Sequence, residues 1–323
     1  MRLRMRNFAF FVLVFMSVAL AGWTSPAGSD LLALVPEGAQ IVAGIEDPHN
    51  STSSGRLLLV THNCNLDFND WVAITGVDPH READEVIEAA TSSAEGELKE
   101  HLLLVAGRFD REHIFRAALE NGAAMAEYRG RGLLVVRPFA RESLEMNGAR
   151  WMAILDDRFT IFGAPELVRK SLDRYLSQAG PDPMLVKRLR QIRPDVNSWN
   201  VLVMSGPMLA RHVDLGQLHA PWTHILDKAD ELTVGIHYGS TDRIDFVVHA
   251  VSREVTSSLA GLAASPRLIS LDLSPDMRPR LRNLSVEQGC VRGSFLVPDE
   301  QFHRWLATIF DQRSSGSIPE SER

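Results

Sequence analysis

The stretch from His101 to Ser177 constrains the fold more than any other part of the chain, because strand-like and helix-like patterns alternate in it at short intervals. His101 to Gly107 is an apolar run closed by a glycine, which predicts a buried strand. Asp110 follows where a carboxylate can cap free N–H groups, so a helix is predicted to begin there. Gly122 supplies the left-handed residue that commonly ends such a helix.

The rest of this stretch predicts three more strands and a second helix. Leu133–Arg137, Trp151–Leu155 and Phe159–Phe162 are apolar runs, and the last two are separated by the turn-forming residues Asp156, Asp157 and Arg158. Pro165 then begins a helix at a position that needs no N–H donor.

Elsewhere the apolar patterns are shorter. Strands are predicted at Ile41–Ile45, Asp84–Ala90, Trp199–Met204 and Val286–Val297, and a helix at Leu66–Thr75 that ends at Gly76. Leu232–Tyr238 and Ile244–Val251 predict a hairpin. Pairing Tyr238 with Ile244 collects the apolar side chains on one face and places His237 opposite Asp245 on the other.

These patterns favour an α+β fold. Hairpin connections indicate antiparallel sheet, and we expect amphipathic helices to cover one face of it. Strand pairs followed by helices recur on both sides of Gly180, which suggests a duplicated ββα-type unit. The predicted organisation is a first half at residues 22–180, a second half at 181–312 that is either separate or one domain with the first, and a disordered tail at 313–323.

Residues 1–21 have the pattern of a signal peptide. Arg2, Arg4 and Arg6 precede an apolar segment from Phe8 to Leu20, and small residues lie at Ala19 and Ala21. The alternative is an uncleaved anchor, although the apolar run is short for a membrane span. The sequence therefore predicts export to the periplasm or the medium, with no transmembrane span after cleavage.

The composition excludes few functions. The chain has 323 residues, 45% of them hydrophobic, which is enough for a sizeable core. The formal net charge is −7 and no Lys/Arg cluster indicates a nucleic-acid partner. No cofactor motif is present. The two cysteines, Cys64 and Cys290, are candidates for a disulfide in an oxidising compartment, and the alternative is two unpaired thiols.

No sequence motif for catalysis or metal binding is complete. His212, His219 and His224 invite a metal interpretation, but Gly216 and Pro221 interrupt the helix that would align them, so no metal site is predicted. His237 and Asp245 are the best available pair for general base chemistry, and a surface pair is the alternative.

Several short segments resemble uncharacterised exported bacterial proteins. They are Leu34–Ile45, Thr75–Pro79, Gly107–Asp110 and Met152–Asp157, in this order along the chain. The polar loop Pro48–Gly55 departs from the pattern, which has a helix there. The resemblance implies export and an α+β fold, and it implies no activity and no site residues.

Three functions remain open. The first is a non-enzymatic exported protein that binds an apolar ligand or a protein partner in the bacterial envelope. The second is a hydrolase whose site is assembled from distant residues, with His237 and Asp245 as candidates. The third is a protein–protein interaction module, dimeric through a sheet edge.

Overall fold

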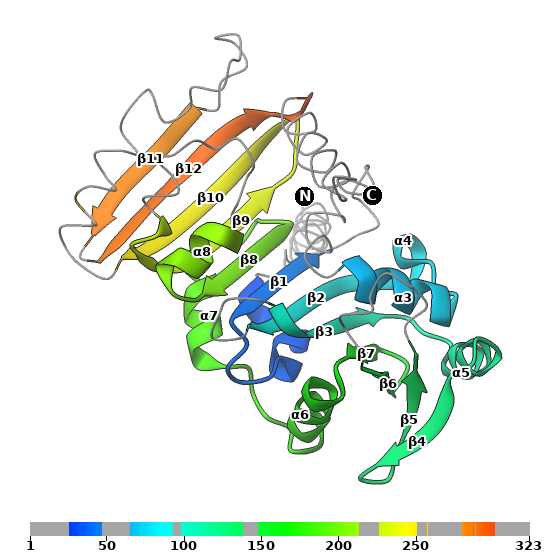
Figure 1. Ribbon diagram of the computed structural model, residues 1–323. Coiled ribbons are helices and arrows are strands. Elements are labelled where there is room, and N and C mark those ends of the chain that lie inside the picture. Colours follow the sequence, from blue (N-terminus) through cyan, green and yellow to red (C-terminus); the bar gives the residue numbers. More distant parts are fainter. Residues whose placement is uncertain are drawn as a thin grey trace, which may run out of the picture.

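The computed structural model describes residues 26–46, 65–92, 98–137, 148–212, 226–250, 257, 280–287 and 289–300 (Figure 1). Their core is one antiparallel sheet of twelve strands. The strands are β1 (Ile41–Glu46), β2 (Ala83–Ser92), β3 (Leu98–Gly107), β4 (Ala124–Tyr128), β5 (Arg131–Val136), β6 (Arg150–Leu155), β7 (Phe159–Gly163), β8 (Ser198–Val203), β9 (Ala229–His237), β10 (Thr241–Ala250), β11 (Arg280–Glu287) and β12 (Cys290–Pro298). Their spatial order is β11-β12-β10-β9-β8-β1-β2-β3-β7-β6-β5-β4.

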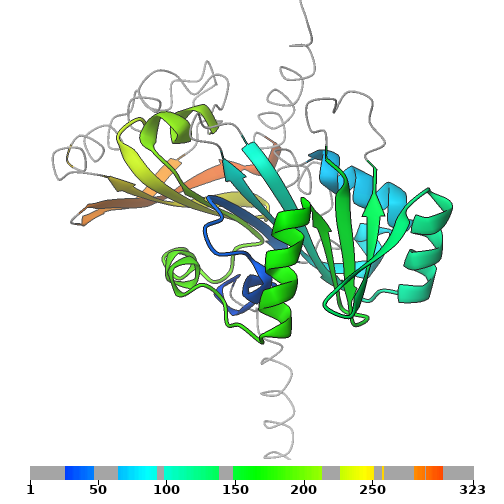
Figure 2. The ribbon, with the colours of Figure 1, turned by 60° about the horizontal axis from the view of Figure 1, so that its bottom comes forward.

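Helices lie on both faces of this sheet (Figure 2). We call one face the α6 face. It is covered by η1 (Pro26–Gly28), η2 (Asp30–Leu34), α6 (Pro165–Leu176) and α7 (Pro183–Leu189). The other is the α3 face. It is covered by α3 (Asn65–Thr75), α5 (Arg111–Glu120) and α8 (Gly206–His212), and the short helix α4 (Pro79–Glu82) precedes β2.

The α+β class is confirmed, but the prediction that helices cover only one face is wrong. The physical reason lies in the central strands. Five successive residues of β1, Ile41–Ile45, are buried, and so are five successive residues of β3, His101–Val105. A strand that is apolar on both faces needs cover on both.

The order of ten of the twelve strands is symmetric about the β1–β8 pair, and β5 and β4 extend one side further. β1 pairs with β8. The strands on one side follow in the order β1-β2-β3-β7-β6 and those on the other in the order β8-β9-β10-β12-β11, so the two series correspond strand by strand. The two strands are joined by five aligned residue pairs, from Ile41 with Leu202 to Ile45 with Ser198. One continuous sheet therefore crosses the predicted boundary at Gly180, and the division into halves stays a prediction.

The end caps within the stretch from His101 to Ser177 follow the sequence closely. Asp110 accepts a hydrogen bond from the His113 N–H at 3.0 Å and so caps α5. Gly122 has a φ of 85°, the left-handed conformation predicted for it. Pro165 begins α6. The additional strand β4 was not predicted, because its exposed sequence, AMAEY, carries no apolar alternation.

Two predicted strands differ from the structure. In the hairpin of β9 and β10, His237 pairs with Arg243 and Asp245 pairs with Gly235, so the predicted register is wrong by two residues. A shorter loop is closed by Asp242, whose Oδ1 accepts the Gly239 N–H at 3.0 Å. The single strand predicted at Val286–Val297 is a second hairpin, β11 with β12, turned at Gly289 with a φ of 75°.

Several predictions fall on residues outside the described ranges. They include the leader at 1–21, the tail at 313–323, His219, His224 and Cys64. Cys290 is a buried free thiol on the α6 face, where burial raises its pKa, and its pairing with Cys64 stays a prediction. No helix in the described ranges is long and apolar enough to cross a membrane.

Candidate functional site

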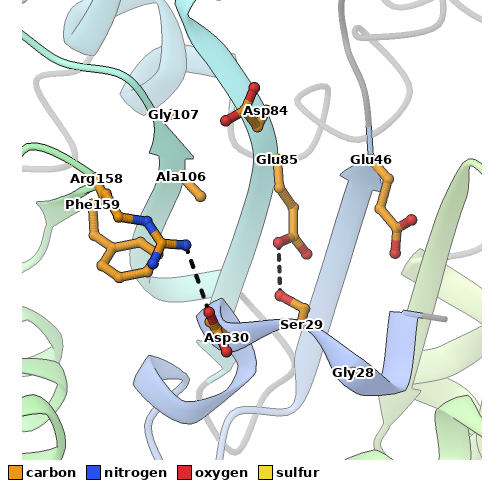
Figure 3. Close-up of a pocket in the computed structure, with 10 residues that line it drawn as sticks. All are labelled: Gly28, Ser29, Asp30, Glu46, Asp84, Glu85, Ala106, Gly107, Arg158 and Phe159. Carbon is orange, nitrogen blue, oxygen red and sulfur yellow. Dashed lines mark hydrogen bonds and ion pairs between the residues drawn. The ribbon is translucent and has the colours of Figure 1, made fainter. Parts of the chain in front are cut away.

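A pocket of about 330 Å³ opens on the α6 face, where β1 ends and β2 begins (Figure 3). Strand pairing aligns Glu46 of β1 with Glu85 of β2, Glu85 with Ala106 of β3, and Ala106 with Phe159 of β7. These four residues form one row across the sheet, which we call the first row. The two carboxylates lie directly opposite each other on neighbouring strands, which is destabilising when both are ionised.

The rim of the pocket comes from η1, η2 and the turn before β7. Ser29 caps η2 by accepting the Leu31 N–H at 3.1 Å, and its own hydroxyl donates to Glu85 Oε2 at 2.7 Å. Gly107 lies against the opposite wall, where its N–H donates to the Arg158 carbonyl at 2.9 Å. A Cβ at Gly107 would lie 2.0 Å from the Glu82 carbonyl oxygen, so only glycine permits this approach.

The carboxyl group of Glu85 is buried, although the residue as a whole is partly exposed. Its Oε1 has no hydrogen-bond partner among the described residues. The nearest cation on the rim is engaged elsewhere: Arg158 Nη2 lies 3.6 Å from Asp30 Oδ2, and both side chains are largely exposed. Figure 3 shows the Arg158 guanidinium reaching into the pocket, with a dashed line that joins it to Asp30 and none that joins it to Glu46 or Glu85.

This environment raises the pKa of both glutamates. Burial, and then the charge of Glu85, raise the pKa of Glu46 to about 8. Burial raises the pKa of Glu85 to about 7. The hydrogen bond from Ser29 acts in the opposite direction, and the charge of Asp30 adds to the rise. Shared burial of two carboxylates in a cavity is an arrangement that a bound cation would relieve.

The stability of the ligand-free protein should therefore fall as the pH rises through neutrality. The folded protein retains protons that the unfolded chain, with glutamate pKa values near 4.5, has already released. The contribution is full below pH 4.5 and is lost as the pH rises toward 7 for Glu85 and 8 for Glu46. Asp30 and Asp84 add negative charge at the rim, and Arg158 opposes them.

Thermal melts at about pH 5 and pH 8 and constant ionic strength test this expectation. The melting temperature of the wild type should fall by several degrees more than that of the double variant E46Q/E85Q, since roughly 1 kcal/mol corresponds to a few degrees in a chain of this size. Equal pH slopes in the two proteins would contradict the assignment.

A second charged cluster lies on the α6 face next to the pocket, across the β1–β8 junction. Arg243 Nε donates to Asp245 Oδ2 at 3.1 Å, and its Nη2 donates to Asp195. Ser294 donates to Asp245 Oδ1 at 2.6 Å. Burial alone would raise the pKa of Asp195, but the hydrogen bond from Arg243 and its charge outweigh burial and lower it. The cluster is a buried ion-pair network, and we interpret it as stabilising the fold.

The structure does not join His237 and Asp245 as the hydrolase hypothesis requires. Asp245 is held by Arg243 and Ser294, and the Nδ1–H of His237 donates to the Asp195 carbonyl oxygen. The sequence placed both residues on the correct face but in the wrong register. His212 ends α8, while His219 and His224 lie outside the described residues, within which no group of three or more metal-ligating side chains occurs.

Comparison with known proteins gives no functional assignment. No protein-family model matches the chain, and no curated protein matches it. Among solved structures, crystal form I of TP0453 is similar with a TM-score of 0.48 at 14% identity, over 87% of this chain and 98% of that one. Crystal form III of TP0453 gives 0.49 at 12% identity, over 87% and 99%. Both TM-scores are too low to support an argument about function.

Proposed function

We propose that this chain is an exported, non-enzymatic binding protein and that the pocket at Glu46 and Glu85 is its ligand site. The leader at residues 1–21 supports export. The observation that carries the proposal is Glu85, which lines a cavity of about 330 Å³ and whose buried Oε1 lacks a hydrogen-bond partner in the described structure. A buried polar atom without a partner costs stability, and a ligand donor would remove that cost.

The pocket favours a polar ligand over the apolar ligand that the sequence left open. Four carboxylates and one guanidinium line it (Asp30, Glu46, Asp84, Glu85 and Arg158), while the apolar clusters of the sheet are covered by helices. A protein partner at a sheet edge remains a separate proposal. It would use β4, where Met125 is 58% exposed, and a monomer by sedimentation at high concentration would contradict it.

Native mass spectrometry with a blocked pocket tests the ligand site. The protein is incubated with a mixture of small metabolites, and bound masses are recorded for the wild type and for Gly28→Trp. Gly28 lines the pocket, and a Cβ there would meet no atom within 4 Å, so the indole can occupy the cavity without strain at its own position.

We expect a bound species in the wild type that is lost in Gly28→Trp and retained in Gly148→Ala, where a Cβ also meets nothing within 4 Å. The proposal fails if no species binds, or if the blocked variant binds the same species equally well.

We also propose that the two halves arose by duplication of one unit that is larger than ββα. Corresponding strands have nearly equal lengths: six residues in β1 and β8, ten and nine in β2 and β9, and ten in both β3 and β10. Helices follow β1 and β8 on the same α3 face. Superposition of the β1–β3 backbone on β8–β10 tests this, and divergent strand paths would refute it.

A further inference from the structure

We propose that the acidic pocket recognises a guanidinium group, an inference that rests on the pocket being the ligand site. The molecule itself contains an arginine bound at the matching place in its second half. Three observations carry the argument: the register of the strands, the contacts of that arginine, and the unpartnered carboxylate oxygen of the first half.

The register places an equivalent of the first row on the other side of the sheet. Pairing aligns Val203 of β8 with Glu231 of β9, Glu231 with His249 of β10, and His249 with Cys290 of β12. We call these four residues the second row. Each strand holds the same place in the order as its counterpart, so Glu231 corresponds to Glu85. Both rows lie on the α6 face.

In the second row, side chains from α7 and the residues just after it contact Glu231 and His249. Arg188 of α7 donates from Nε to Glu231 Oε2 at 2.7 Å, and the two side chains are 17% and 14% exposed. Gln191, just beyond α7, contacts His249 Nε2 through its Oε1 at 3.0 Å, and His249 Nε2 lies 3.6 Å from Glu231 Oε1. A largely buried guanidinium therefore neutralises the carboxylate that corresponds to Glu85.

In the first row the carboxylate has no such cation among the described residues. Ser29 satisfies only Glu85 Oε2, and Oε1 remains buried without a partner. Val203 of the second row is replaced by Glu46, so the first row carries two carboxylates where the second carries one. Where Arg188 lies beside the second row, the first row has a cavity of about 330 Å³.

A planar guanidinium fits this pair of carboxylates better than an ammonium does. Five N–H donors in a fixed fork can contact two carboxylates on adjacent strands at once, whereas an ammonium acts as a compact point charge. Ala106 and Phe159 continue the first row. The Arg158 guanidinium lies over the Phe159 ring, with 5.0 Å from its carbon to the ring centroid, so Ala106 and the remaining surface of the ring offer apolar contact to an alkyl stem. The ligand class is therefore a small molecule or an exposed peptide residue that carries a guanidinium on an alkyl chain.

Isothermal titration calorimetry at about pH 8 with agmatine as the probe tests the proposal. We expect saturable binding at one site, and at least tenfold weaker binding in Glu85→Gln and in Glu46→Gln. Glu120→Gln, an exposed position on α5, is the matched control and should bind as the wild type does. Putrescine, a dication with an ammonium at each end of the same four-carbon chain, should bind at least tenfold more weakly than agmatine. Equal affinity for putrescine, or no loss in both pocket variants, would overturn the proposal.

Two further titrations test whether the guanidinium belongs to a small molecule or to a protein, and whether the contact of Arg188 with Glu231 corresponds to ligand binding at Glu85. Tighter binding of the peptide Gly-Arg-Gly than of agmatine would assign the ligand to a protein partner, and the reverse to a small molecule. Arg188→Ala should add a second agmatine site at Glu231, which raises the stoichiometry from one to two. A stoichiometry that stays at one in a folded variant would contradict the correspondence between the rows.

The outcome is separable from that of the proposed function. If the wild type binds a neutral or anionic metabolite that Gly28→Trp excludes, the pocket is the ligand site and only the guanidinium assignment fails. If no metabolite and no guanidinium compound binds, both proposals fail together.

Discussion

Replacement of Arg243 by methionine is expected to cost roughly 3–5 kcal/mol of folding stability at neutral pH, the range found when one partner of a buried ion pair is removed. The side chains of Arg243 and Asp245 are 13% and 7% exposed. Without the guanidinium, Asp245 retains only the hydrogen bond from Ser294 among the residues that the structure describes, and Asp195 loses the cation that it contacts. Urea denaturation at pH 7 measures the loss.

A second substitution and a change of pH separate charge from packing in this variant. The double variant R243M/D245N removes the negative charge that R243M leaves at position 245 without a cation. It should therefore recover a substantial part of the lost folding stability. Lower pH should also narrow the difference in folding stability between R243M and the wild type. Arg243 lowers the pKa of Asp195 in the wild type, and the stability gained from this contact is lost as Asp195 becomes protonated. If R243M is as stable as the wild type at pH 7, the ion pairs of Arg243 do not stabilise the fold, and the interpretation of the cluster is contradicted.

Gly44→Ala is expected to destabilise the centre of the sheet by at least 1–3 kcal/mol, roughly 5 °C or more in melting temperature. Gly44 of β1 pairs with Trp199 of β8, whose indole is fully buried. A Cβ at Gly44 would lie 2.4 Å from two carbons of that ring, and β1 and β8 are the neighbouring strands about which the strand order is symmetric.

Gly148→Ala is the matched control, because a Cβ there meets no atom within 4 Å, and its melting temperature should change little. The reason for the loss is tested by adding Trp199→Leu to Gly44→Ala. A smaller ring-free side chain relieves the overlap, so the two substitutions should be less damaging together than the sum of their separate effects. Strict additivity, or an unchanged melting temperature for Gly44→Ala, would contradict the close approach.

Local sequence signals predicted the elements well where a cap or turn residue marked them. Asp110, Gly122 and Pro165 set the ends of α5 and α6 in the sequence and in the structure alike. The hairpin register was missed because apolar alternation fixes which face a residue occupies but not which partner it has. A shift of two residues keeps every side chain of β9 and β10 on its face. The Asp242 hydrogen bond in the loop and the hydrogen bond from the Tyr238 N–H to Asn197 Oδ1 belong to the actual register, and apolar alternation does not reveal them.

The pocket could not be predicted because it depends on the order of strands that are distant in the chain. Glu46 ends one apolar run, and Glu85 lies near the start of another, about forty residues later. Only the pairing of β1 with β2 places the two carboxylates opposite each other, and only the placement of η1 and η2 closes a cavity above them. One signal is present in the sequence and was not used: Glu85 alternates with Ile87 and Ala89, which places a carboxylate on the same strand face as these buried residues.

A crystal structure of the protein with agmatine at about pH 8 would show whether the pocket at Glu46 and Glu85 binds a guanidinium. We expect a guanidinium in the cavity on the α6 face, within hydrogen-bond distance of a carboxylate oxygen of Glu85 and of one of Glu46, with its alkyl chain against Ala106 and Phe159. Agmatine bound elsewhere on the surface, or a cavity that stays free of agmatine at saturating concentration, would contradict it.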